Sequence, residues 1–299
     1  MRTLYQVDSF TVTPFTGNPA GVVLDATGLT DADMLAVARE LNNSETAFVL
    51  PADAADHDVR VRFFTPTVEV PTCGHATVAA HFARAVEYGL PSCSLVQKTG
   101  GGLLQRVEVH RDGDRVRIGM HQGTATFGPE LTGGQVDRLL RALGATPADL
   151  ADGGPVQVVS TGHAKVLVEL RDHTTVDALR PDPVGLTALS REVDTNGFFV
   201  FTRATLEPDV LTWARMFAPA IGIAEDPVTG NGHGPLGAYL VRHGMVPAPG
   251  GTLSFTGRQG AAMGRRGEVR VRVDVQPDDT LSVSISGDAT TAFRAELTI

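Results

Sequence analysis

The two halves of this chain contain the same series of short segments in the same order. Five segment pairs match: GNPAGVVL with GHAKVLVEL, SETAFVL with TNGFFVF, RFFTP with RMFAP, CGHA with GNGH, and RDGDRVRIGMHQGTATF with PDDTLSVSISGDATTAF. One such match is weak, but five in one order indicate a duplicated unit of roughly 120–150 residues, too long for a solenoid repeat. The 299-residue chain is therefore expected to form two related domains, residues 1–120 and 121–299, with a last strand able to cross back to the first half.

Each unit has the pattern of short strands around one apolar helix. Alternation in VDSFTVT and the apolar runs GVVLDA, TAFVLP and DVRVRFF predict strands. Thr30, followed by Asp33 three residues later, predicts the start of a helix. The segment HATVAAHFARAVEYG is apolar around much of its circumference, so it is expected to be a helix buried inside its own domain. The predicted fold class is α+β, with a cleft between two related halves.

The charge balance argues against two kinds of partner. The chain has 25 basic and 34 acidic residues, a net charge of −9, and Lys98 and Lys165 are its only lysines. Because no basic patch is evident, neither nucleic acid nor an anionic membrane is an expected partner. No run of about 18 uncharged apolar residues predicts a membrane span.

Two features indicate the compartment. Cys73 and Cys93 are too few for a disulfide framework, which is typical of a reducing environment. The N-terminal segment MRTLYQVDSF lacks the long apolar stretch of a signal peptide. We therefore expect a cytoplasmic protein.

A glycine-rich turn comes directly before the apolar helix in each half. One turn contains Gly74, and the other contains Gly230 and Asn231. Such turns direct free backbone N–H groups, at the positive end of a helix dipole, toward one point. The alternative is that the glycines only allow helix and strand to pack closely. For a pair of turns placed by duplication we favour anion binding, and we expect both to face one cleft and hold a carboxylate-bearing substrate.

The second turn also contains a GxGxxG pattern, at Gly232, Gly234 and Gly237. A dinucleotide site needs an apolar strand before this pattern and an acid about 20 residues after it. The sequence has neither. Glu225-Asp226-Pro227 comes before the pattern, and the first acid after Gly237 is Glu268. A P-loop, an HExxH motif and a close cluster of cysteine and histidine are also absent from the sequence, so it supports neither a nucleotide site of these kinds nor a metal site.

Three titratable residues are candidates for chemistry. Glu45 begins the apolar segment TAFVL, where partial burial raises a carboxyl pKa toward the range for proton transfer. Its duplicate position in the segment match is Asn196, so one half alone kept a carboxylate. His75 and Asp226 lie in or beside the two turns, where they either act on substrate or cap a helix.

The motifs that contain these residues resemble those of a known family. GNPAGVVLDA, NNSETAFVLP, CGHAT and EDPVTGNGHGPLGAYLV, in this order and spacing, resemble the PhzF-like family of phenazine biosynthesis. That family is related to diaminopimelate epimerase and proline racemase, and the similarity extends over essentially the whole chain. The resemblance implies two similar halves, each a barrel-like, mostly antiparallel sheet around a central helix, with the active site in the cleft. It also implies a homodimer that needs no cofactor.

The resemblance also assigns roles to residues. Glu45 matches the family's acid/base glutamate, Gly74 and His75 match the glycine and histidine of the first turn, and Asp226 matches the aspartate that opens the second motif. Asn231 stands where the founding isomerases usually have serine, which points to a different substrate. The implied reaction moves a proton on a small carboxylate, as in the isomerisation of trans-2,3-dihydro-3-hydroxyanthranilate.

Two other functions stay open at this point. The epimerase relatives use a cysteine in each turn, and here the first place holds Cys73 while the segment match puts Gly230 at the second. A two-thiol racemase is therefore not expected, although an amino-acid or imino-acid epimerase that uses Cys73 alone is an alternative. Cys73 otherwise lines the substrate site or is only packed. The other alternative is a family member that binds carboxylates without catalysis.

Overall fold

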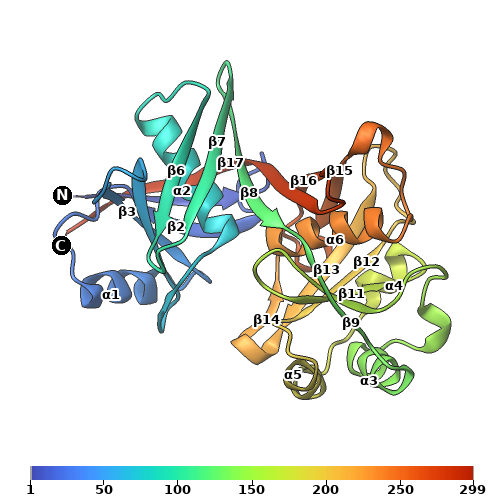
Figure 1. Cartoon of the computed structure of the whole chain (residues 1–299). Helices are drawn as coiled ribbons and strands as arrows, with labels where there is room; N and C mark the ends of the chain where they lie inside the picture. Colours follow the sequence, from blue (N-terminus) through green and yellow to red (C-terminus); the bar gives the residue numbers. More distant parts are fainter. Residues whose placement is uncertain (1, 299) are drawn as a thin grey trace. The chain divides into compact units, whose positions relative to one another are not determined.

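The computed structural model describes residues 2–298, which divide into two units (Figure 1). Unit 1 consists of the residues up to His121 together with those from Ser286 onward, and unit 2 is Gln122–Ile285. Among the described residues, no helix is both long enough and apolar enough to cross a membrane.

Unit 1 contains nine strands, two of them shared with unit 2, and two α-helices. They are β1 (Arg2–Ser9), β2 (Asn18–Val23), α1 (Asp31–Leu41), β3 (Thr46–Pro51), β4 (Val59–Phe64), β5 (Glu69–Val70), α2 (Gly74–Glu87), β6 (Cys93–Thr99), β7 (Leu104–Asp112), β8 (Arg115–Thr124) and β17 (Leu281–Leu297). Helix α1 begins as predicted, since Thr30 and Asp33 form a reciprocal capping box. It packs on the outside of the sheet, against β3 and β4.

The sheet of unit 1 closes into a barrel around α2. Strands β2 and β3 are parallel, as are β4 and β6. The pairs β1–β17, β1–β2, β3–β4, β4–β5, β6–β7 and β7–β8 are antiparallel. Strand β17 pairs with both β1 and β8, which closes the barrel. Helix α2 contacts β1, β2, β3, β4 and β7. Its consecutive residues from His75 to Ala83 are all buried, and the many alanines among them let the strands approach on all sides.

Unit 2 repeats this order of elements with two additional α-helices. It contains β9 (Thr126–Glu130), α3 (Gly133–Leu143), β10 (Gln157–Ser160), β11 (Lys165–Glu169), α4 (His173–Ala178), α5 (Pro183–Glu192), β12 (Phe198–Thr202), β13 (Thr212–Ala218), β14 (Ile223–Asp226), α6 (Gly230–Arg242), β15 (Thr252–Gln259) and β16 (Gly267–Val275). The parallel pairs are again two, β11 with β12 and β13 with β15. Helix α6 is buried like α2 and packs on β10, β11, β15 and β16. The predicted α+β class, with two similar halves around central helices, is confirmed.

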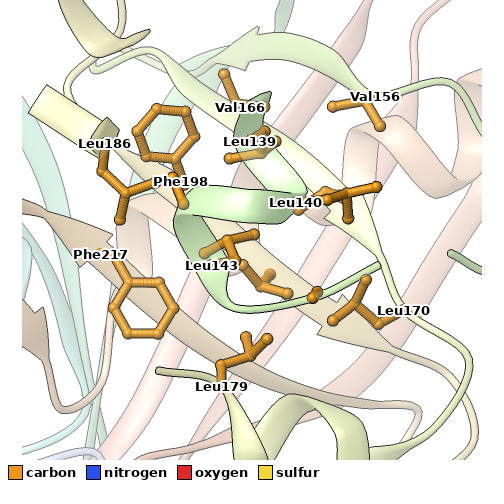
Figure 2. Close-up of a cluster of buried hydrophobic side chains, with 14 of the residues drawn as sticks. Leu139, Leu140, Leu143, Val156, Val166, Leu170, Leu179, Leu186, Phe198 and Phe217 are labelled. Atoms are coloured by element: carbon orange, nitrogen blue, oxygen red, sulfur yellow. The ribbon is translucent and has the colours of Figure 1, made fainter. Parts of the chain in front are cut away.

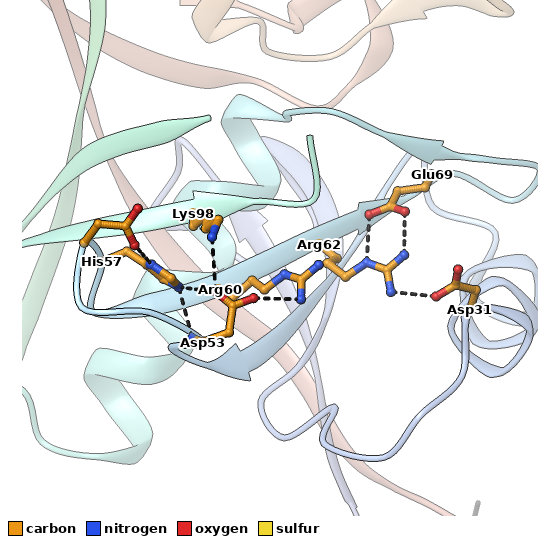
Figure 3. Close-up of polar contacts among 8 residues, drawn as sticks. Asp31, Asp53, His57, Arg60, Arg62, Glu69 and Lys98 are labelled. Carbon is orange, nitrogen blue, oxygen red and sulfur yellow. Dashed lines mark hydrogen bonds and ion pairs between the residues drawn. The ribbon is translucent and has the colours of Figure 1, made fainter. Parts of the chain in front are cut away.

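One ion pair occurs at matching places in the two units. In unit 1, Arg62 of β4 makes a two-pronged contact with Glu69 of β5, with Nε 2.8 Å from Oε1 (Figure 3). In unit 2, Arg215 of β13 contacts Glu225 of β14 in the same way, with both N···O distances 2.8 Å. Matched side-chain contacts of this kind support the duplication more strongly than sequence similarity does.

Helices α3, α4 and α5 of unit 2 enclose a core on the side of the sheet away from α6. Leu139, Leu140 and Leu143 of α3 pack there against Val166 of β11 and Phe198 of β12 (Figure 2). In strands, successive side chains point to opposite faces. Val166 and Val168 point into this core, so Lys165, Leu167 and Glu169 point to the face that α6 covers.

Candidate active site

The turn that begins α2 holds three of the predicted site residues at fixed places. Cys73 is the residue before the helix, and its carbonyl oxygen accepts hydrogen bonds from the Thr77 amide (3.0 Å) and hydroxyl (2.7 Å). The carbonyl oxygen of His75 accepts a hydrogen bond of 2.8 Å from Ser9 Oγ of β1. Gly74 is the first residue of the helix. This turn is therefore anchored both within the helix and to the barrel wall.

Glu45 reaches the same turn from the loop between α1 and β3. The side-chain amides of Asn43 and Gln6 exchange two hydrogen bonds (2.9 and 3.0 Å), which tie this loop to β1. Two residues later, Glu45 Oε2 lies 3.5 Å from His75 Nε2. Ser44 Oγ lies 3.3 Å from the same nitrogen. The fold thus brings a carboxylate and a hydroxyl to the same ring nitrogen of one imidazole.

The other ring nitrogen of His75 faces a thiol. Cys73 Sγ lies 3.5 Å from His75 Nδ1. The side chains of Glu45 and His75 are 13% and 8% exposed, so the cluster is shielded from solvent while Glu45 keeps some access. An imidazole between a carboxylate and a thiol can hold or relay a proton on either side.

The same three side chains also satisfy the spacing of a metal site. One donor atom each from Glu45, Cys73 and His75 lies within 4.8 Å of the other two. Carboxylate, thiolate and imidazole are ligands that Zn²⁺ accepts. The sequence analysis expected no metal site because no motif places these residues together. The cluster forms only in three dimensions, when the α1–β3 loop reaches the turn before α2.

In unit 2, a glutamine holds the loop between β14 and α6. Gln259 Nε2 donates to the Asp226 carbonyl (2.7 Å) and to Thr229 Oγ1 (3.1 Å), and its Oε1 accepts from the Thr229 amide (3.0 Å). The Thr229 hydroxyl in turn donates a short hydrogen bond to the Asp226 carboxylate. The Asp226 carboxylate is therefore held in place by the Thr229 hydroxyl.

Gly230 and Asn231 are the first two residues of α6. Asn231 Oδ1 accepts a hydrogen bond of 2.9 Å from Gln122 Nε2. Gln122 Oε1 accepts one of 3.0 Å from Thr161 Oγ1, so the connection continues to the turn between β10 and β11. Asn231 is thus part of a hydrogen-bond network at the helix start.

The structure corrects two equivalences drawn from the segment matches. Each apolar helix begins at a glycine, Gly74 or Gly230, so the residue equivalent to Cys73 is Thr229 rather than Gly230. The second half therefore offers a hydroxyl where the first offers a thiol. A two-thiol pair remains impossible, because the residue equivalent to Cys73 is a threonine rather than a second cysteine.

The second correction concerns the counterpart of Glu45. Gly21 pairs with Thr46, and Val166 pairs with Phe198. Gly21 and Val166 are each the fifth residue of the matched segments GNPAGVVL and GHAKVLVEL, so their strand partners Thr46 and Phe198 are equivalent. One residue earlier in each strand, Gly197 is then equivalent to Glu45. Asn196 corresponds to Ser44 instead, and its Nδ2 lies 3.0 Å from His163 Nδ1. Unit 2 has no side chain at the position of the carboxylate.

The structure brings the predicted residues into two groups, one in each unit. Glu45, Cys73, Gly74 and His75 meet in unit 1, and Asp226, Gly230 and Asn231 meet in unit 2. Sequence analysis missed Ser44, although it stands next to Glu45 in the same motif. It also missed Lys165, which was noted only as one of two lysines. A lysine within the apolar run AKVLVEL was a signal of burial that we did not use.

Comparison with known proteins agrees with this geometry. A family model described as phenazine biosynthesis-like protein matches residues 7–295. The uncharacterized isomerase YddE of Escherichia coli K12 is 48% identical over 296 residues, which cover 99% of this chain and 98% of that protein. The trans-2,3-dihydro-3-hydroxyanthranilate isomerase of Pseudomonas chlororaphis is 30% identical over 295 residues, 98% of each chain.

Solved structures show the same fold. A phenazine biosynthesis protein of the PhzF family from Bacillus anthracis superposes with a TM-score of 0.90 at 29% identity, covering 100% of this chain and 99% of that one. A probable proline racemase from Agrobacterium radiobacter shares the fold at a TM-score of 0.66 and 14% identity, covering 100% and 93% of the two chains.

The relatives that name an activity are isomerases, and this chain is an enzyme of that class. With a family model matched over nearly the whole chain, it belongs to the phenazine biosynthesis-like, or PhzF, family.

Proposed function

We propose that this enzyme moves a proton between two carbon positions of a small carboxylate by acid/base catalysis. The observation that supports this most directly is the 3.5 Å separation of Glu45 Oε2 and His75 Nε2 at the start of a buried helix. A carboxylate beside an imidazole, largely shielded from water, can accept a proton from carbon and return it. The 30% identical relative named for dihydro-hydroxyanthranilate isomerisation acts on a substrate of this class.

In the proposed mechanism, Glu45 removes a proton from a carbon next to an unsaturated system. The electron pair left behind is delocalised into that system. The proton held by Glu45 or His75 exchanges with solvent, and a proton is then returned from one of these groups to another carbon of the system. Atoms and charge balance without an oxidant or a cofactor. Proton transfer by one placed group contributes about 10²–10⁴-fold to the rate, so positioning must supply the rest.

The other groups have supporting roles in this proposal. His75 is fixed through its carbonyl by Ser9, and it orients Glu45 or exchanges protons with it. In unit 2, Asp226 orients a polar group of the bound carboxylate, and the backbone N–H groups at Gly230-Asn231 bind its anionic part. In unit 1, the backbone N–H groups of the turn at Gly74 favour an anion in the same way. We further propose that the protein works as a homodimer in the cytoplasm.

The test is the incorporation of deuterium from solvent. The wild-type enzyme is incubated in D₂O with a panel of cyclic and amino-acid carboxylates, and each substrate and product is examined by mass spectrometry. We expect one deuterium at carbon in the substrates that react, and none with Glu45→Gln. If a panel member is converted and neither the substrate nor the product gains deuterium at carbon, the reaction does not use a base that exchanges its proton with solvent.

A second candidate is an epimerase that uses the thiol. The 3.5 Å contact between Cys73 Sγ and His75 Nδ1 favours it, because a neighbouring imidazole can deprotonate a thiol. Here the product is the mirror configuration at one carbon rather than a shifted double bond. Alkylation of Cys73 distinguishes the two functions, since it stops the epimerase and, unless its bulk blocks the site, leaves the carboxylate-based isomerase active. Cys73→Ala answers the same question without added bulk.

A further inference from the structure

Lys165 is a buried cation that the mechanism above does not use. It is 4% exposed, and it is the first residue of β11. Because Val166 points into the core formed with α3 and α5, Lys165 points to the face of the sheet that α6 covers. The residue at the equivalent ladder position of unit 1, just before Gly21, is Ala20. The cation is therefore specific to the second half.

The ammonium group of Lys165 has too few partners for its burial. An ammonium has three N–H donors. Among the residues that the structure describes, Nζ makes one hydrogen bond, a long one of 3.4 Å to the carbonyl oxygen of the preceding Ala164. No ion pair within 4.0 Å is formed by it in residues 2–298, although Asp226 is near enough to act on its charge. A buried charge without a partner is costly, so such a group normally has a ligand or a function.

Lys165 lies beside the anion-attracting end of α6. The hydrogen bonds from Thr161 through Gln122 to Asn231 tie the turn before β11 to the first turn of that helix. Strand β11 also packs directly on α6. The N-terminus of a helix favours an anion, and an unpaired ammonium on the neighbouring strand favours the same anion.

We propose that Lys165 binds the carboxylate group of the ligand, in unit 2, at the start of α6. The choice of a carboxylate rests on the proposed function, while the presence of an anion site rests on the burial and missing partners of Lys165. When the anion binds, the ammonium gains the partner that the protein itself does not supply. Asp226, the last residue of β14, then faces the part of the ligand that carries hydrogen-bond donors.

The charges around Lys165 make its titration a sensitive probe of this site. Burial lowers the pKa of Lys165 to about 8, and the Asp226 carboxylate opposes that effect. The ammonium in turn helps to lower the pKa of His163, after the larger effect of burial. On α6, burial lowers the pKa of His233 to about 3, so this imidazole is neutral near pH 8. A bound carboxylate raises the pKa of Lys165, because an opposite charge favours the protonated form.

The test uses the fact that the chain has only two lysines. Protein labelled with ¹³C at the lysine ε-carbon gives two resonances, and Lys98→Arg assigns them. Lys98 is the internal control, since it is partly exposed and already paired with Asp53 at 3.2 Å. The pH titration of both resonances is recorded without ligand, with benzoate, and with benzamide, which has the same shape but no charge.

We expect benzoate to raise the midpoint of the Lys165 titration by about one unit or more, and benzamide to leave it unchanged. The Lys98 resonance should respond to neither. Lys165→Met, which keeps the length of the side chain, should weaken benzoate binding at least about tenfold, whereas Lys98→Met should not. The proposal is overturned if benzoate, acetate and bicarbonate all leave the Lys165 resonance unmoved, or if Lys165→Met binds benzoate as well as the wild type does.

The result is separable from the fate of the proposed function. Glu45→Gln should abolish deuterium exchange and leave the response of Lys165 to benzoate intact. A response of Lys165 without any exchange would retain the carboxylate site and reject the isomerase mechanism. Deuterium exchange without a response of Lys165 to benzoate would retain the isomerase mechanism and reject the carboxylate site.

Discussion

Glu45 Oε2 and His75 Nε2 lie 3.5 Å apart, although residues 46–74, which include β3, β4 and β5, separate the two residues along the chain. Hydrogen bonds at two places support this contact. The paired amides of Asn43 and Gln6 hold the loop that carries Glu45, and Ser9 holds the turn that carries His75. Both Gln6 and Ser9 belong to β1, so one strand positions both partners.

The first prediction concerns Glu45. The change Glu45→Gln keeps the size and hydrogen bonding of the side chain but removes the proton acceptor. We expect the variant to fold normally and to lose at least about 10²-fold in the rate of deuterium exchange. The exchange rate by mass spectrometry and the thermal midpoint by circular dichroism are the two measurements.

The matched control for this change is Glu40→Gln. Glu40 is an exposed residue of α1, so the substitution makes the same chemical change away from the cluster. It should leave the exchange rate within about twofold of wild type, as expected for a surface substitution. Equal exchange rates in both variants would remove Glu45 from the role of base.

The second prediction ranks the thiol below the carboxylate. Cys73→Ala should reduce exchange much less than Glu45→Gln does, because the equivalent place in unit 2 is Thr229 and no two-thiol relay can form. His75→Ala should fall between them, since water replaces an orienting group in part. The three exchange rates are compared under one set of conditions. If Cys73→Ala is the most damaging change and Glu45→Gln is near wild type, the enzyme is a thiol epimerase.

The duplication was predictable from sequence because it rests on local segments in a preserved order. Periodicity also identified the buried helices, and the Thr30–Asp33 spacing identified the start of α1. The pairing of the halves residue by residue was less certain, since similar apolar strands align equally well one residue apart. Only the hydrogen-bonded register showed that Gly197, and not Asn196, stands at the place of Glu45.

The chemistry of the site was predictable only in part. Motif residues such as Glu45 and His75 were found, because their chemistry and spacing are local. The contact between Cys73 and His75 and the proximity of Glu45 depend on how the barrel closes around α2. The apolar run around Lys165 signals that the residue is buried, but the sequence of β11 alone does not show which face of the strand α3 and α5 cover and which face α6 covers.

The third prediction compares the two matching arginines. Besides its contact with Glu225, Arg215 Nη1 donates to the carbonyl oxygens of Val176, Asp177 and Leu179, at 3.1 to 3.2 Å. A lysine cannot make this set of contacts, because it lacks the planar fork of donors. We expect Arg215→Lys to lower the free energy of unfolding by about 1–3 kcal/mol, as when buried acceptors lose their donor. Urea denaturation measures this value.

Arg62→Lys is the internal control for Arg215→Lys. Arg62 makes the same contact with Glu69, but its second partner, Asp31, is 79% exposed, and Glu69 is more exposed than Glu225 (30% against 16%). Solvent screens such a pair, so the loss should stay below about 1 kcal/mol. A loss for Arg62→Lys as large as that for Arg215→Lys would show that burial does not set the strength of this repeated pair.

The last prediction concerns the acid stability of the barrel in unit 1. His81 of α2 is fully buried, and its Nδ1 must accept from Arg84 (3.1 Å), so its Nε2–H donates to Gln97 Oε1 (2.8 Å). Burial, and then the charge of Arg84, lower the pKa of His81 to about 3. The unfolded chain therefore binds this proton first as the pH falls below about 6.5. Between that pH and about 3, protonation of His81 should decrease the free energy of unfolding by up to about 1.4 kcal/mol per pH unit.

Denaturant titrations from pH 7.5 to 5 measure this effect. His81→Gln should be less stable than the wild type at pH 7.5 but lose less stability on acidification. His110→Gln, a change at an exposed position, should follow the wild type. If His81→Gln and the wild type lose the same stability over this range, protonation of His81 does not contribute to acid unfolding.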